Sequence, residues 1–178
     1  MDSRLKVAGH AVHPMLIPIP LGMFIGTVVF DLLYLITDDA QYATVSFFMA
    51  ATAVVGGLLA IATGAVDYAA IPKGTRAKRV GTVHAIGNDI VVALFAISWL
   101  LRLRADDHEP SALALTLTFA GAALSFVTGW LGGELVERLG VGVDDDAHLN
   151  ASNSLKAGPL IRMQPGNKAS ADSAPRKG

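Results

Sequence analysis

Four long apolar segments, separated by short polar loops, dominate the hydrophobic pattern of the chain. They cover residues 14–37, 43–66, 80–101 and 111–131. Each is close to the roughly 20 residues that a helix needs to cross a hydrocarbon core of about 30 Å. Apolar runs of this length predict membrane-spanning helices. We therefore expect an all-α integral membrane four-helix bundle that occupies residues 13–143.

The regions outside this bundle are short and polar. Residues 1–12 form an N-terminal segment. From residue 144 to residue 178 the sequence has no periodic apolar face, which predicts a disordered tail. Basic residues gather at one end of the predicted helices and are sparse at the other, so by the positive-inside rule we expect a multi-pass protein of the cytoplasmic membrane with both termini in the cytoplasm. The cytoplasmic set is Arg4, Lys6, Lys73, Arg76, Lys78, Arg79 and Arg138, and the opposite set is Arg102 and Arg104.

Composition supports this assignment and removes several kinds of chemistry. The 178 residues are 52% hydrophobic and 16% charged, with a mean hydropathy of +0.49, which is too apolar for an ordinary soluble domain. The absence of cysteine excludes disulfides, thiolate metal sites, iron–sulfur ligation and covalent haem attachment. A net charge of −1 gives no reason to expect a nucleic-acid partner. The expected environment is a lipid bilayer.

The third apolar segment carries polar residues that are costly in lipid and therefore indicate a functional site. His84 and Asn88 are four residues apart, which places them on one helical face, whereas Asp89 falls on a second face. We expect both Asn88 and Asp89 to be buried polar residues. Asp31, near the far end of the first segment, is interpreted as an interfacial acid.

Polar residues also recur at the cytoplasmic ends of the four segments, as His13, Asp67, His84 and Glu134. The order of a histidine, two apolar segments, Thr-Gly and an acid occurs twice, from His13 and from His84. This order is consistent with a duplicated helical hairpin or with coincidence. Small residues predict close helix packing, and those of the first and fourth segments recur at four-residue spacing. They are Gly22, Gly26, Gly57, Gly64, Gly121, Ser125, Gly129 and Gly133.

At several of these positions the chain resembles a family of four-pass bacterial membrane proteins known as domain of unknown function 2231 (DUF2231). The matching features are His13-Pro14 with Pro20, Thr63-Gly64 with Asp67, His84 with Asn88, and Gly129 with Gly132-Gly133-Glu134. The resemblance covers residues 8–143. It implies a bacterial inner-membrane protein, and because some relatives are joined to Rieske-type iron–sulfur domains, it also implies an electron-transfer setting.

Two kinds of cofactor chemistry are consistent with the histidines. His13 and His84 could hold a b-type haem inside the bundle, because imidazole is a common axial ligand, and the protein would then be an electron-transfer module or a membrane partner subunit. Alternatively, His13, Asp67, His84 and Glu134 could bind a divalent metal or a proton without redox chemistry. In a third interpretation the histidines are structural hydrogen-bonding groups. The sequence contains no nucleophile–base pair and no phosphate-binding loop, which favours a non-enzymatic role. The expected protein partner is a redox protein or a second copy of the chain.

Overall fold

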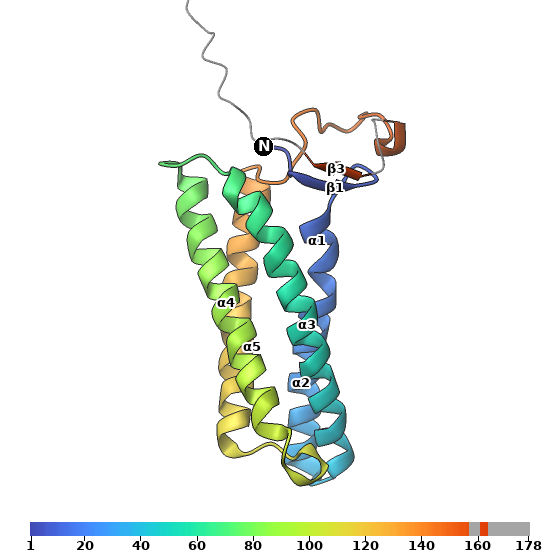
Figure 1. Ribbon diagram of the computed structural model, residues 1–178, viewed down its shortest axis with the longest axis vertical. Helices are drawn as coiled ribbons and strands as arrows, with labels where there is room; N and C mark the ends of the chain where they lie inside the picture. The colour runs from blue at the N-terminus through green and yellow to red at the C-terminus, as the bar shows by residue number, and fades with distance from the viewer. Residues whose placement is uncertain (157–160, 164–178) are drawn as a thin grey trace, which may run out of the picture.

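A computed structural model describes residues 1–156 and 161–163 and shows four long helices packed side by side (Figure 1). The long helices are α2 (Pro18–Thr37), α3 (Ala40–Ala70), α4 (Arg76–Arg102) and α5 (Ala112–Gly133). A short helix α1 (Val12–Leu16) leads into α2, a 3₁₀ turn η1 (Asp106–His108) joins α4 to α5, and a π-helical turn η2 (Glu134–Arg138) extends α5. The described residues also include a 3₁₀ turn η3 (Ser154–Lys156) and the strands β1 (Leu5–Val7), β2 (His10–Ala11) and β3 (Ile161–Met163).

The four predicted spans are confirmed, and α3 and α4 are longer than expected. All four are long and apolar enough to cross a membrane. Helices α3 and α4 begin at side-chain caps, in which Asp39 accepts a hydrogen bond from the backbone of Gln41 and Thr75 accepts one from Lys78. These caps lie in polar loops outside the apolar runs, so each helix extends beyond the hydrophobic segment that predicts it.

Apolar side chains fill the middle of the bundle and also cover its outside. Phe24 of α2 and Phe95 of α4 meet there, with ring centroids 4.2 Å apart. They pack with Ala53, Val54, Val91 and Val92. On the outer surface Ile36 is 79% exposed and Phe126 is 76% exposed. An apolar exterior of this kind fits lipid as the surrounding solvent.

At the end of the bundle that carries the N-terminus, here called the terminal end, a small sheet lies above α1 (Figure 1). Strand β1 lies between β2 and β3 and is antiparallel to both, with Lys6 opposite Ala11 and Arg162. The Lys6 ammonium pairs with the carboxylates of Asp2 and Asp144. Although burial acts to lower the pKa of Lys6, these hydrogen bonds and charges outweigh it, and the net effect is a raised pKa.

Within the described residues, part of the predicted tail contacts the terminal end of the bundle. The N-terminal ammonium of Met1 contacts Asp145, and β3 extends the sheet. The apolar pattern did not indicate these contacts because they are made by backbone groups and charges. Residues 157–160 and 164–178 of the expected tail lie outside the described residues.

The two helical hairpins, α2–α3 and α4–α5, repeat the same contacts. Asp31 and Arg102 are 71 residues apart in sequence, and the same offset relates His13 to His84, Phe24 to Phe95 and Thr27 to Ser98. A second constant offset relates Ala60 to Thr128, Gly64 to Gly132 and Ser46 to Ala114. These contacts support the duplicated hairpin. They change the alignment of its two halves, because the residue equivalent to Gly64 is Gly132 and not Gly129.

Candidate functional site

His13 and His84 occupy equivalent places near the terminal end of the bundle. Nδ1 of His13, on α1, lies 2.8 Å from the carbonyl oxygen of Ala60 on α3. Nδ1 of His84, on α4, lies 2.9 Å from the carbonyl oxygen of Thr128 on α5. Because a carbonyl oxygen can only accept, Nδ1 carries the hydrogen in both rings, and in a neutral imidazole of this tautomer the lone pair is on Nε2.

A glycine makes each of these contacts sterically possible. The carbonyls of Ala60 and Thr128 belong to regular helices, where the side chain four residues later leans back over the carbonyl. At that position stand Gly64 and Gly132. A Cβ built on Gly64 would lie 2.8 Å from Cε1 of His13, and one on Gly132 would lie 3.1 Å from Cε1 of His84. Because these glycines have no side chain, the two carbonyl oxygens remain accessible to the imidazoles.

Asn88 adds a second contact to His84. Its side-chain nitrogen lies 3.2 Å from Nε2 of His84 and 2.9 Å from the backbone oxygen of the same residue. The shared face predicted for these two residues is confirmed by this contact. For His13, the described residues offer Nε2 no hydrogen-bond partner, which leaves that nitrogen available as a ligand.

Asp67 and Glu134, the predicted acids of the terminal end, bind other groups instead of the histidines. Asp67 is buried and accepts hydrogen bonds from the Ser3 hydroxyl at 2.9 Å and the backbone nitrogen of Arg4 at 2.8 Å. Glu134 pairs with Arg76 at 2.6 Å. Among the described residues no three His, Asp or Glu side chains come together as a metal site. The structure thus does not assemble the four-residue metal set that we expected.

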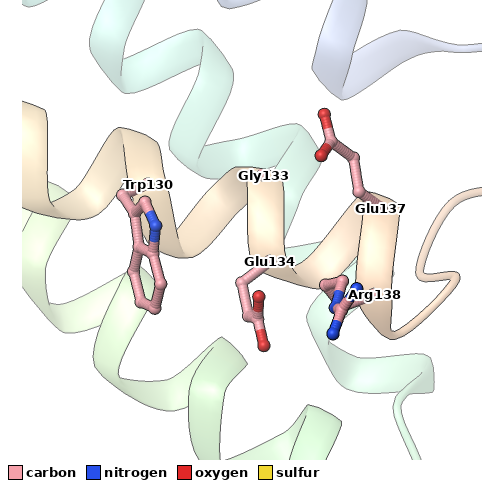
Figure 2. Close-up of a pocket in the computed structure, with 5 residues that line it drawn as sticks. All are labelled: Trp130, Gly133, Glu134, Glu137 and Arg138. Carbon is pink, nitrogen blue, oxygen red and sulfur yellow. The ribbon is translucent and has the colours of Figure 1, made fainter.

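A surface pocket of about 330 Å³ lies beside Glu134 where α5 passes into η2. Figure 2 shows Trp130, Glu134 and Arg138 on one side of the helix and Glu137 directed away from them. The carboxylate of Glu134 is already bound to Arg76, so it is not an unpaired group for a ligand in this pocket.

The distal end of the bundle, opposite the terminal end, holds an ion pair that the sequence analysis missed. The carboxylate of Asp31 on α2 and the guanidinium of Arg102 on α4 form two parallel hydrogen bonds of 2.6 and 2.8 Å. Both side chains are 0% exposed. The expectation of an interfacial Asp31 is therefore wrong, because Arg102 folds back into the bundle and neutralises it there.

Hydroxyl groups complete this distal cluster, which we define as Asp31, Ser46, Ser98, Arg102 and Thr118. Ser46 donates to Asp31 at 2.5 Å, and the guanidinium reaches the hydroxyls of Ser46, Ser98 and Thr118 at 2.9, 3.2 and 3.0 Å. All five side chains are buried. Residues from all four long helices thus share one polar network, with its charges paired as burial requires.

The α4–α5 loop closes the distal end over this cluster. His108 stacks on the ring of Phe47, with centroids 3.8 Å apart and planes 7° apart. Its Nδ1 donates to the backbone oxygen of Arg102 at 3.2 Å. This histidine lies in a polar loop, so its packing against the bundle has no counterpart in the hydrophobic pattern.

Asp89 is not buried, contrary to expectation. It lies on the outer surface of α4, and the described residues give it neither a hydrogen bond nor an ion pair. The helix that carries it turns His84 and Asn88 inward, so the adjacent position faces outward.

The small residues expected at helix contacts divide into two groups. Gly26, Gly57, Gly64 and Gly121 lie against side chains of a neighbouring element, which confirms close packing at those positions. At Gly22, Gly129 and Gly133 an added Cβ would meet no other group within 4 Å. The Ser125 hydroxyl bonds to the Ala122 carbonyl of its own helix. The packing interpretation therefore fits the first group within this chain and not the second.

These features define a small protein with four helices of membrane-spanning length and polar groups paired inside the bundle. The chain belongs to the family of predicted membrane proteins DUF2231, whose model matches residues 9–145. No curated protein and no solved structure matches the chain.

Proposed function

We propose that the protein is a haem-b-binding electron-transfer module in which His13 and His84 would hold the haem iron. The observation that carries this proposal is the equivalent orientation of the two imidazoles, each fixed by an Nδ1–H bond to a backbone carbonyl. Histidines that ligate a metal are commonly held in this way, because the bond sets the tautomer and presents the Nε2 lone pair. The two residues also come from the two different hairpins, as a ligand held between helices of a bundle requires.

The donor set fits haem iron better than a divalent metal. Bis-imidazole ligation needs only two protein ligands, whereas a metal site of the kind considered would also need Asp67 or Glu134. Both acids are already paired with other groups. Bound haem would supply one-electron redox chemistry, and this chain would orient the two imidazoles and keep bulk water away. To bind the iron, Nε2 of His84 would have to give up its contact with the Asn88 side chain.

The test is a haemin titration of the detergent-purified protein, followed by visible spectra of the oxidised and dithionite-reduced forms. We expect a one-to-one complex with a sharp reduced α-band, and loss of that band in both His13→Ala and His84→Ala. His10→Ala is the matched control, because among the described residues this exposed side chain bonds only to the nearby Ala8 carbonyl. Absence of a saturable complex, or a band unchanged in either ligand variant, would refute the proposal.

For orientation we propose that the terminal end faces the cytoplasm of a bacterial inner membrane, supported by its excess of basic residues. The chain has no cysteine, so a single introduced cysteine reports its own accessibility. In intact cells a membrane-impermeant maleimide should label Arg104→Cys and leave Lys73→Cys unlabelled. The reverse pattern would invert the proposed topology.

A further inference from the structure

Asp89 is an acidic side chain on the outer surface of a membrane-spanning helix, midway between the helix ends. It stands 13 residues from Arg76 and 13 from Arg102, about 20 Å from each at 1.5 Å per residue. Residues on the same surface of α4 are apolar, and Ile86 and Ile90 are 54% and 46% exposed. The described residues contain no group that bonds to the carboxyl. A free carboxylate in hydrocarbon is unfavourable, and none of the described residues neutralises this one.

We propose that this surface of α4 binds a transmembrane helix of a different protein, which carries a lysine or arginine near its midpoint. Charge complementarity is the reason for this partner. A basic side chain at the same depth would pair with Asp89 and remove two unfavourable charges from lipid at once. The small side chain of Ala93, one turn further along the same surface, lets such a helix approach closely.

The long helices of a second copy cannot provide the basic group at the depth of Asp89. Between Arg79 and Arg102, and throughout α2, α3 and α5, the sequence contains no lysine or arginine. Arg102 itself is buried and bound to Asp31. In a pair of copies, Asp89 would therefore meet apolar residues or another Asp89. The proposal rests on this surface alone and is independent of haem binding.

The experiment measures how the full chain associates with a synthetic helix in phosphatidylcholine vesicles at pH 7.4. The probe is a leucine–alanine transmembrane peptide with one central lysine, and its matched control has glutamine at that position. A donor dye is attached to a single cysteine at Arg104→Cys, an exposed site just beyond α4, and energy transfer to the labelled peptide reports binding. We expect about tenfold tighter association with the lysine helix than with the glutamine helix.

Asp89→Asn should abolish this preference, whereas Glu137→Gln, which changes an exposed acid on η2, should leave it intact. The helical circular dichroism of each variant verifies that it is folded. Equal association of the native chain with both peptides would overturn the proposal, because Asp89 would then be accommodated by lipid. Energy transfer between two copies of the chain that is lost in Asp89→Asn would also overturn it, in favour of a homomeric contact.

Discussion

Removing one member of the Asp31–Arg102 pair should destabilise the bundle more than any other single polar substitution in the described residues. The perturbation is Asp31→Asn, which preserves side-chain size but leaves the guanidinium without its counter-charge. Both side chains are 0% exposed, so water cannot replace the lost partner. An uncompensated charge left by breaking a buried pair costs about 3–5 kcal/mol.

We expect the lower end of that range, about 3 kcal/mol, for two reasons. The hydroxyls of Ser98 and Thr118 still accept hydrogen bonds from the guanidinium. In addition, polar groups of an unfolded chain in a membrane or micelle also find partners, which reduces the measured difference. Asp38→Asn is the control, because this acid at the same end is exposed, and it should change stability by less than about 0.5 kcal/mol.

The exchange variant Asp31→Arg/Arg102→Asp tests whether the two positions are equivalent. If they are, the pair should form in reverse and recover more than half of the lost stability. Recovery should be incomplete, because the residue equivalent to Thr118 is Ala50 and the reversed guanidinium lacks that hydroxyl. One missing hydrogen bond corresponds to about 1 kcal/mol.

The assay is SDS-induced unfolding in dodecylmaltoside micelles, followed by tryptophan fluorescence. Trp99 is the useful reporter because its ring lies 5.9 Å from that of Phe47, close to the distal cluster. Trp130 is 67% exposed on the outer surface and would be replaced by Phe in every variant. A loss below about 1 kcal/mol in Asp31→Asn, or an exchange variant no more stable than Asp31→Asn, would refute the reasoning.

Two further predictions concern the terminal end. Gly64→Ala should displace the His13 ring and destabilise the fold by about 1–3 kcal/mol, whereas Gly22→Ala, where an added Cβ meets nothing, should be nearly neutral in the same SDS assay. Because the folded pKa of Lys6 is raised, its pairing stabilises the sheet fully below the unfolded value of 10.5 and is lost as pH rises through the folded value. Hydrogen exchange of β1 amides should therefore accelerate, relative to α3 amides, above pH 10.5, and a Lys6→Met variant should lack this step.

The fold was predictable because lipid imposes a simple rule on sequence. A spanning helix must be about 20 residues long and apolar, so the four segments can be read directly from the hydrophobic pattern. The helix ends were less accurate, because Asp39 and Thr75 cap their helices in polar loops. Strand β3 could not be anticipated, since three residues paired through the backbone leave no periodic signal.

The polar sites were less predictable from the sequence than the helices, because their hydrogen-bond partners lie on other helices. Sequence analysis identified His84 because a histidine inside an apolar run is unusual, and His13 because it stands at the start of the first run, but it could not identify their carbonyl partners. Gly132, four residues after Thr128, was the available signal, since a glycine at that place uncovers the carbonyl. Arg102 was interpreted as a loop charge because it directly follows its apolar segment, and only the packing of four helices shows that its side chain turns inward.

The repeat explains why opposite charges meet at the distal end. Equivalent residues of the two hairpins approach each other in the middle of the bundle, as the Phe24 and Phe95 rings do at 4.2 Å. Had the positions of Asp31 and Arg102 kept the same residue, two like charges would face each other in a dry interior, where neither could be ionised without a large desolvation cost. Opposite residues turn that repulsion into a bidentate pair that joins the hairpins. The pair therefore requires two hairpins that differ in sequence, and a dimer of identical hairpins could not form it.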